Sequence, residues 1–198
     1  MTTEAFFTLL TLALAAAWTP GPNNALLATS GISFGLRRTV PHILGVALGF
    51  PVMVFLVGMF LGVLFQTSVL LQEVLRYGGA AMLLWVAWKI ATAGGIGSGK
   101  GRTRPFYFHE AAAFQWINPK GWVMAISLTA QFVNPARPIQ TALIVTAVFF
   151  GVGVTSALGW AAGGVVLRRF LSTGNGLKAF NIAMGVLIAL GVVVLFRH

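Results

Sequence analysis

Six long apolar segments, separated by short polar or basic stretches, constrain this chain more than any other feature. A helix that crosses a lipid bilayer needs about 20 apolar residues. Segments of that length run over residues 4–33, 40–65, 73–92, 107–133, 139–167 and 177–196. Only 8% of the residues are charged, whereas soluble domains carry about 25%. The sequence therefore predicts an all-α integral membrane protein with six transmembrane helices, in which residues 1–198 form a single transmembrane domain.

The first apolar segment is interrupted by Thr19-Pro20-Gly21-Pro22-Asn23-Asn24. Each proline removes a backbone donor, and its ring clashes with the carbonyl group four residues earlier, while Gly21 permits a sharp turn. In lipid every freed backbone group needs a partner, so a broken helix is tolerated only where protein encloses it or where it lines a cavity. The break therefore indicates a functional site within the membrane.

A second break, Trp116-Ile117-Asn118-Pro119-Lys120-Gly121-Trp122, interrupts the fourth segment. Asn followed by Pro is typical of an N-cap and the first residue of a new helix, so Asn118 is expected to cap the helix that follows. Interruptions by Gly and Pro at corresponding places in two halves of a chain indicate the binding site of a transporter.

The positions of the two breaks also predict how the chain is organised. Six helices divide into two sets of three, and the odd number in each set makes the second set enter the membrane in the opposite sense. We therefore expect two inverted three-helix repeats, over about residues 1–92 and 107–198, joined by a cytoplasmic linker at about 93–106. Helices 1 and 4 would both be broken at mid-membrane.

Lysine and arginine are distributed unevenly between the two sides of the predicted helices. Nine of the thirteen fall on the side of the first, third and fifth loops: Arg37, Arg38, Lys89, Lys100, Arg102, Arg104, Arg168, Arg169 and Lys178. Positive residues concentrate on the cytoplasmic side of membrane proteins, so both termini are expected to face outward. The same rule accounts for the net charge of +10 without a nucleic-acid partner.

Composition excludes several classes of chemistry. The chain has no cysteine, which excludes disulfides, thiol redox chemistry and thiolate metal sites. Its three acidic residues are Glu4, Glu73 and Glu110, and its three histidines are His42, His109 and His198. The acids nearly rule out an enzyme with paired carboxylates, and the histidines show no metal-ligand spacing. We expect no enzyme activity, no cofactor and no metal.

The two breaks together can bind a small polar molecule. Two helix N-termini would converge at mid-membrane, each with unpaired N–H groups and about half a positive charge, which suits a carboxylate. The carbonyl groups that end the preceding helices suit an ammonium group. A zwitterionic amino acid fits this arrangement, as do other small polar solutes. The expected substrate-binding residues are Pro20, Gly21, Pro22, Asn23, Asn24, Gln115, Trp116, Asn118, Pro119 and Lys120.

Lys120 is the most informative single residue, because a lysine near mid-membrane costs about 2.5–3.5 kcal/mol on insertion scales. It would bind a substrate carboxylate or carry a proton, or it would only satisfy free carbonyl groups at the break; the sequence leaves these roles open. His42, Glu110, Arg37 and Arg38 are candidates for coupling or gating. For His42 and Glu110 the simpler hypothesis is that they are solvated residues at the cytoplasmic edge, and for the arginines that they only set the topology.

Glycines four residues apart occur in three of the apolar segments. The pairs are Gly45 and Gly49, Gly58 and Gly62, and Gly159 and Gly163. Such pairs allow helices to approach closely. We interpret them as packing surfaces within the monomer rather than as a dimer interface, although a homodimer remains open.

Several motifs resemble a known family. The first break, followed by Ser30-Gly31, Gly35, Arg37-Arg38-Thr39, Pro41-His42, Gly45 and Gly49-Phe50, resembles the N-terminal signature of the LysE/RhtB family of amino-acid exporters. The second break, with Phe114 and Gln115 before it, resembles that family's Asn-Pro-Lys motif. The stretch Trp85-Val86-Ala87-Trp88-Lys89-Ile90-Ala91-Thr92 resembles the cysteine/O-acetylserine exporter branch.

The resemblance spans the whole chain and implies six helices in the bacterial inner membrane, with both termini in the periplasm on the orientation above. It also implies export of amino acids or their derivatives by proton antiport. We therefore expect a secondary transporter with alternating access around a midplane site. The alternative is a passive pore for small polar solutes on the same fold, and a scaffold without transport is disfavoured because it needs neither break.

Overall fold

A computed structural model describes residues 1–61, 67–92, 103–171 and 176–194, which form helices and no strand. In chain order the helices are α1 (Thr3–Trp18), α2 (Pro22–Phe34), α3 (Leu36–Leu56), the π-helix η1 (Val57–Leu61), α5 (Val69–Ala91), α6 (Phe108–Phe114), the 3-10 helix η2 (Gln115–Ile117), α7 (Pro119–Phe132), α8 (Pro138–Leu171) and α9 (Gly176–Val194). Large apolar side chains such as Phe7, Val52 and Leu70 are exposed on the outside, as expected for a surface in contact with lipid.

Four of the described helices are long and apolar enough to cross a membrane: α3 with η1, α5, α8 and α9. The pair α1 and α2, bent by 55° at the first break, makes a fifth candidate span. The fourth predicted segment is divided into pieces of 7, 3 and 14 residues and does not meet the same criterion. The all-helical membrane fold is therefore confirmed, while six spans in two inverted repeats stay a prediction.

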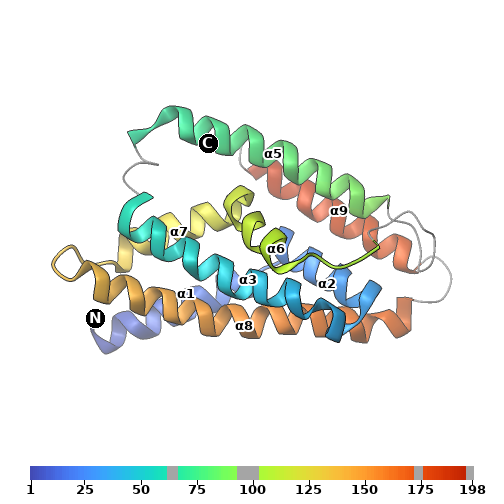
Figure 1. Cartoon of the computed structure of the whole chain (residues 1–198), viewed down its shortest axis with the longest axis horizontal. Helices are drawn as coiled ribbons and strands as arrows, with labels where there is room; N and C mark the ends of the chain where they lie inside the picture. Colours follow the sequence, from blue (N-terminus) through green and yellow to red (C-terminus); the bar gives the residue numbers. More distant parts are fainter. Residues whose placement is uncertain (62–66, 93–102, 172–175, 195–198) are drawn as a thin grey trace.

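The helices pack around two main apolar clusters. The first joins buried residues of α1, α3, α7 and α8, and the second joins buried residues of α2, α5, α6 and α9. Figure 1 shows α5 and α9 side by side along one flank, with α8 running along the opposite flank. Each broken segment thus contributes one piece to each cluster, so both breaks lie where the two clusters meet.

Two predicted loops are shorter than the sequence suggested. Gly35 has a φ of 78° and links α2 directly to α3, because glycine alone adopts this left-handed conformation without strain. Arg37 and Arg38 therefore lie in the first turn of α3 rather than in a loop. Arg168 and Arg169 likewise lie in the last turn of α8, where positive side chains are favoured by the helix dipole.

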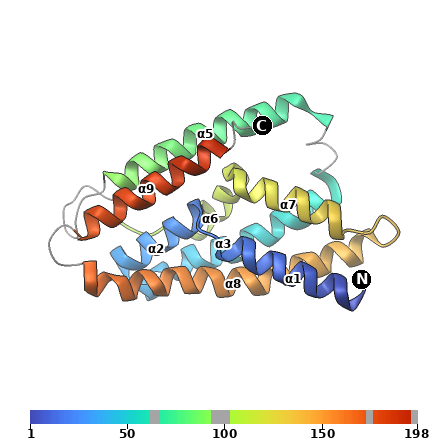
Figure 2. The ribbon, with the colours of Figure 1, turned by 180° about the vertical axis from the view of Figure 1, so that it is seen from behind.

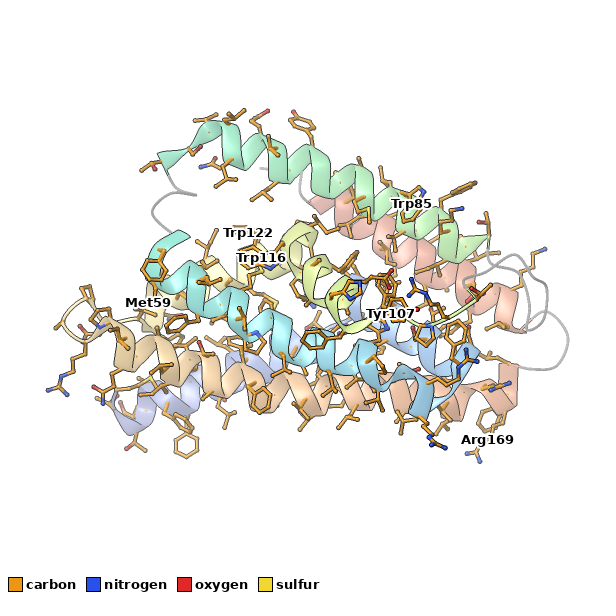
Figure 3. The ribbon with its side chains drawn as sticks, in the orientation of Figure 1. Met59, Trp85, Tyr107, Trp116, Trp122 and Arg169 are labelled. Atoms are coloured by element: carbon orange, nitrogen blue, oxygen red, sulfur yellow. The ribbon has the colours of Figure 1, made fainter. Side chains whose placement is uncertain are left out.

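Most of the described basic residues lie at one end of the molecule, in the first turns of α3 and α9 and in the last turns of α5 and α8. α2, α5 and α8 all finish at this end, and α9 runs back toward the end at which α1 begins (Figures 1 and 2). Arg169 projects outward from it (Figure 3). Most of the predicted linker, residues 93–102, lies outside the described residues, as does Lys100.

Glycine packing within the chain is partly confirmed. A Cβ added at Gly45 would overlap the Phe108 carbonyl oxygen, and one at Gly49 would lie 2.7 Å from the Ala112 Cα, so both glycines admit α6 against α3. Gly58 approaches Thr129 of α7, and Gly159 contacts the ring of Trp18. The prediction for Gly163 is wrong, since nothing lies within 4 Å of its Cβ position. Gly62 lies outside the described residues.

Candidate functional site

The first break is stabilised by side chains that donate hydrogen bonds to the carbonyl groups at the end of α1. Gly21 precedes α2 in an extended conformation, with φ −170° and ψ 180°. The Asn24 amide donates to the carbonyl oxygens of Ala17 and Thr19, both at 2.9 Å. Ser156 of α8 also donates to Ala17, at 2.8 Å. The last carbonyl groups of a helix have no partner within it, so these contacts stabilise the break where water is scarce.

The second break follows a short turn of 3-10 helix. Asn118 is the N-cap residue of α7 and Pro119 is its first residue, as expected, but the Asn118 side chain makes no capping hydrogen bond. Its side chain instead lines the cavity described below, and its Oδ1 atom is buried without a partner among the described residues. The indole of Trp122 donates to the Trp116 carbonyl oxygen at 2.9 Å, and the two rings pack edge to face (Figure 3).

Side chains connect the two breaks directly. Asn23 and Gln115 exchange two hydrogen bonds, with the Asn23 amide donating at 2.7 Å and the Gln115 amide donating back at 3.4 Å. Gln115 also donates to the Ala111 carbonyl oxygen at 2.8 Å and is fully buried. The Lys120 ammonium donates to the Thr19 carbonyl oxygen at 2.7 Å. Residues about a hundred positions apart thus form one site.

A cavity of about 60 Å³ lies between the breaks. Six of the ten predicted binding residues line it: Gly21, Pro22, Asn23, Asn24, Asn118 and Lys120. The other four, Pro20, Gln115, Trp116 and Pro119, are not among the lining residues. Of these, Gln115 is hydrogen-bonded to the lining residue Asn23. This volume holds a few water molecules and is below the roughly 300–1,000 Å³ of typical ligand pockets. The cavity must therefore expand to admit a solute.

Helices α3 and α8 supply cavity residues that sequence analysis missed. They include Val46 and Phe50 from α3, and Phe149, Gly153 and Ser156 from α8. Neither helix carries a break at these positions, so nothing in the local pattern marked them. Of these five residues, only Ser156 could have been suspected from the sequence, because it is a hydroxyl residue in the middle of an apolar helix.

The cavity offers both kinds of helix end. α2 begins at Pro22, which lines the cavity, and α7 begins at Pro119, between the lining residues Asn118 and Lys120. Ala17, in the last turn of α1, also lines the cavity. Among the lining residues only Lys120 carries a formal charge, and none is acidic. Unpaired N–H groups favour an anionic group, while the Thr19 carbonyl accepts hydrogen bonds and the partnerless Asn118 Oδ1 is able to accept one. The chemistry suits a small molecule that carries both a carboxylate and an ammonium group.

Comparison with known proteins gives a consistent result. The LysE type translocator family model matches residues 14–198. The chain belongs to the LysE family. It is 30% identical over 190 residues to the cysteine/O-acetylserine efflux protein of Escherichia coli strain UTI89, and 29% identical to those of Escherichia coli strain K12 and Shigella sonnei, with 94% of each chain covered. No solved structure matches the chain significantly.

In this LysE-family protein, the gating and coupling candidates lie outside the cavity. Arg37 and Arg38 are exposed, and the Arg38 guanidinium lies 5.5 Å from the centre of the Phe34 ring. Glu110 forms a two-point ion pair with Arg104, at 2.7 and 2.8 Å, and accepts the Tyr107 N–H at the start of α6. The hydrogen bond to Glu110 raises the pKa of Arg104. Glu110 is thus a paired helix-capping residue rather than a simply solvated one.

His42 is buried, which corrects the hypothesis of a solvated edge residue. Its side chain is 1% exposed, its Nδ1 lies 3.0 Å from the Ser30 hydroxyl, and its ring packs against Phe106 at 5.0 Å. The difference arises because α3 begins at Leu36, four residues before the predicted start, so His42 falls in the interface between α3 and α2. The LysE-family chain therefore buries a titratable residue near its basic end.

Replacing Glu110 by glutamine tests whether this LysE-family residue couples protons. If transport is coupled to protons, its pH-driven component should stay close to the wild-type level in this variant, because Glu110 is paired with Arg104 at the surface and does not line the cavity. The measurement is pH-driven uptake into proteoliposomes. Loss of the pH-driven component, with exchange retained, would assign the coupling role to Glu110 instead.

Proposed function

We propose that this protein is a secondary transporter that exports a small amino acid or amino-acid derivative from the bacterial cytoplasm. The observation that carries the proposal is the convergence of two broken helices, from the two halves of the chain, on one cavity. Membership of the LysE family and the likeness to cysteine/O-acetylserine efflux proteins support the same substrate class. Pro22, Asn23, Asn24, Asn118 and Lys120 would contact the substrate.

Alternating access between two inverted repeats would move the substrate across the membrane. The support is that corresponding parts of the two halves contact each other: α3 packs on α8, α5 packs on α9, and Asn23 pairs with Gln115 at the two breaks. In this proposal six segments span the inner membrane, and the basic end faces the cytoplasm while both termini face the periplasm. Rocking of one half against the other would open the cavity to each side in turn.

Export would be coupled to proton entry, and His42 is the best-supported candidate for the coupling group. Histidine is the side chain that ordinarily changes charge between pH 5 and 8. His42 is buried between α2 and α3, and α2 begins at the first break. A change in its charge would therefore act on a helix that carries Asn23 and Asn24.

Counterflow of labelled L-cysteine and O-acetyl-L-serine in proteoliposomes, within a panel of amino acids, tests the proposed function. We expect saturable exchange of one or a few of them, and net accumulation when a pH gradient is imposed. In His42→Gln, exchange should persist while the pH-driven accumulation falls to the level seen without a gradient.

The matched control is His109→Gln, which removes an exposed histidine near the start of α6. It should behave as the wild type in both assays. If small polar solutes leak without saturation while no amino acid exchanges, the protein is a passive pore and the exporter proposal fails. If His42→Gln keeps its pH-driven accumulation, the coupling group lies elsewhere.

A further inference from the structure

The Lys120 ammonium group occupies a specific acceptor at the end of α1. The Thr19 carbonyl oxygen accepts from Lys120 Nζ at 2.7 Å and from the Asn24 amide at 2.9 Å. Carbonyl groups at a helix C-terminus carry the negative end of the helix dipole, so a cation is stabilised there. The neighbouring Ala17 carbonyl is already bonded to Asn24 and Ser156. Thr19 is therefore the place at this break where an ammonium group binds.

The Lys120 side chain reaches this acceptor by crossing over Gly21. A Cβ at Gly21 would lie 3.0 Å from Lys120 Cδ and 3.2 Å from Nζ. The extended backbone of Gly21 is open to any residue, so its conformation does not explain the glycine. Because Gly21 has no side chain, the Lys120 side chain has room to pass over it and reach the Thr19 carbonyl oxygen.

A second acceptor, on a residue that lines the cavity, has no donor among the described residues. Asn118 is 3% exposed, lines the cavity, and its Oδ1 atom lacks a hydrogen-bond partner among the described residues. A buried acceptor without a donor is unfavourable, and a ligand that supplies the donor gains the difference. Because no acidic residue lines the cavity, a ligand's ammonium group has only neutral carbonyl, amide and hydroxyl oxygens to bind.

We propose that the Thr19 carbonyl and Asn118 Oδ1 form the subsite for the substrate's primary ammonium group, and that Lys120 is a tethered occupant of this subsite in the empty protein. The inference rests on the proposed export function and deepens it. Two ammonium groups repel each other at hydrogen-bond range, so the substrate enters only as Lys120 withdraws from Thr19. The small volume of the cavity fits this state, in which the lysine fills part of the binding space.

The competing role for Lys120, a direct partner of the substrate carboxylate, predicts the opposite result for one variant. Removing a tethered competitor strengthens amine binding, whereas removing a carboxylate partner weakens the binding of every carboxylate ligand. The test is therefore the affinity of purified Lys120→Met for three probes: L-cysteine, its methyl ester, which keeps the ammonium but masks the carboxylate, and 3-mercaptopropionate, which lacks the ammonium. The chain contains no cysteine, so these thiols form no mixed disulfides with it.

In Lys120→Met, titration calorimetry should show L-cysteine and its methyl ester binding about tenfold more tightly than in the wild type, the equivalent of one charge-assisted hydrogen bond. Asn118→Leu should weaken both amine ligands about tenfold, by loss of the acceptor. Lys120→Arg retains a tethered cation, so it should lack the tenfold gain of affinity expected for Lys120→Met. The control Lys89→Met removes an exposed lysine at the far end of α5 and should change nothing.

A gain of affinity cannot arise from misfolding, so the central result is robust to a loss of stability. Weaker binding of L-cysteine and 3-mercaptopropionate in Lys120→Met would overturn the proposal in favour of a carboxylate partner. Unchanged ester affinity in both Lys120→Met and Asn118→Leu would also overturn it. If the wild type exchanges no amino acid but the variants shift the ester affinity as expected, the proposed export function fails while the ammonium subsite stands.

Discussion

Gly164→Ala is expected to destabilise the protein and to reduce transport at least about tenfold. A Cβ at this position would overlap the carbonyl oxygen of Ala28, and the reciprocal overlap arises between Gly31 and the Ala161 carbonyl. Both obstacles are backbone atoms, which cannot rotate away as a side chain can. Overpacking of this kind costs about 1–3 kcal/mol or more, and it separates α2 from α8, the helices that bring Asn24 and Ser156 to the first break.

The adjacent glycine provides a matched control. Gly163 lies in the same turn of α8, is exposed, and has nothing within 4 Å of its Cβ position. Gly163→Ala gains the same helix propensity, up to about 1 kcal/mol, without the clash. Thermal unfolding of the two purified variants and cysteine counterflow give the comparison. Equal behaviour of the two variants would show that the close crossing of α2 and α8 does not matter for stability.

Gln115→Leu should remove nearly all transport. The Gln115 side chain is fully buried, and its amide bonds to both Asn23 and Ala111. Leucine of similar size would leave the half-buried Asn23 amide without its partner, at a cost of about 1–2 kcal/mol. Asn23 would then adopt another rotamer beside the cavity, and the two breaks would lose their direct side-chain connection. Counterflow at saturating substrate, with membrane levels of the protein normalised, measures the effect.

A double-mutant cycle with Asn23→Leu tests whether the effect comes from the Asn23–Gln115 contact or from the loss of a polar side chain in general. The double variant should be more stable than the sum of the single losses predicts, by about 1–2 kcal/mol, because it leaves neither amide unpaired. Gln131→Leu, the same substitution at an exposed position on α7, serves as the control. Strict additivity of the two single variants would contradict a direct role for the Asn23–Gln115 contact.

Sequence analysis located the two breaks because their determinants are local. Pro20 and Pro22 flank Gly21, and Pro119 follows Asn118, whereas Pro41 and Pro51 lie inside the continuous helix α3. Proline combined with Gly21 or with the Asn118 N-cap, rather than proline alone, therefore marks the breaks. That the two breaks approach each other followed from the expected repeat, and the Asn23–Gln115 and Lys120–Thr19 contacts place them together. The assignment of substrate contacts remains a prediction, because six of the ten residues line the cavity but no ligand contact tests them.

The remaining features depend on packing between distant parts of the chain. Gly31 and Gly164 form a close crossing, yet they lie on different helices and share no four-residue spacing. His42 was placed at the edge because α3 was expected to start at Val40, whereas the single residue Gly35 turns the chain. Asn118 has the sequence of a helix cap, but its side chain lies along the cavity wall instead.

The charge inside the cavity has a consequence for which solutes can pass. Lys120 gives the lining residues one positive charge and no acid opposes it, so a zwitterion enters without changing the total. A cationic solute would place a second positive charge beside the first, at an energy of about 4 kcal/mol for charges 4 Å apart at an effective dielectric constant of about 20. In the proposed site a net positive charge is therefore unfavourable, and dibasic amino acids would bind more weakly than zwitterionic ones even where their side chains fit.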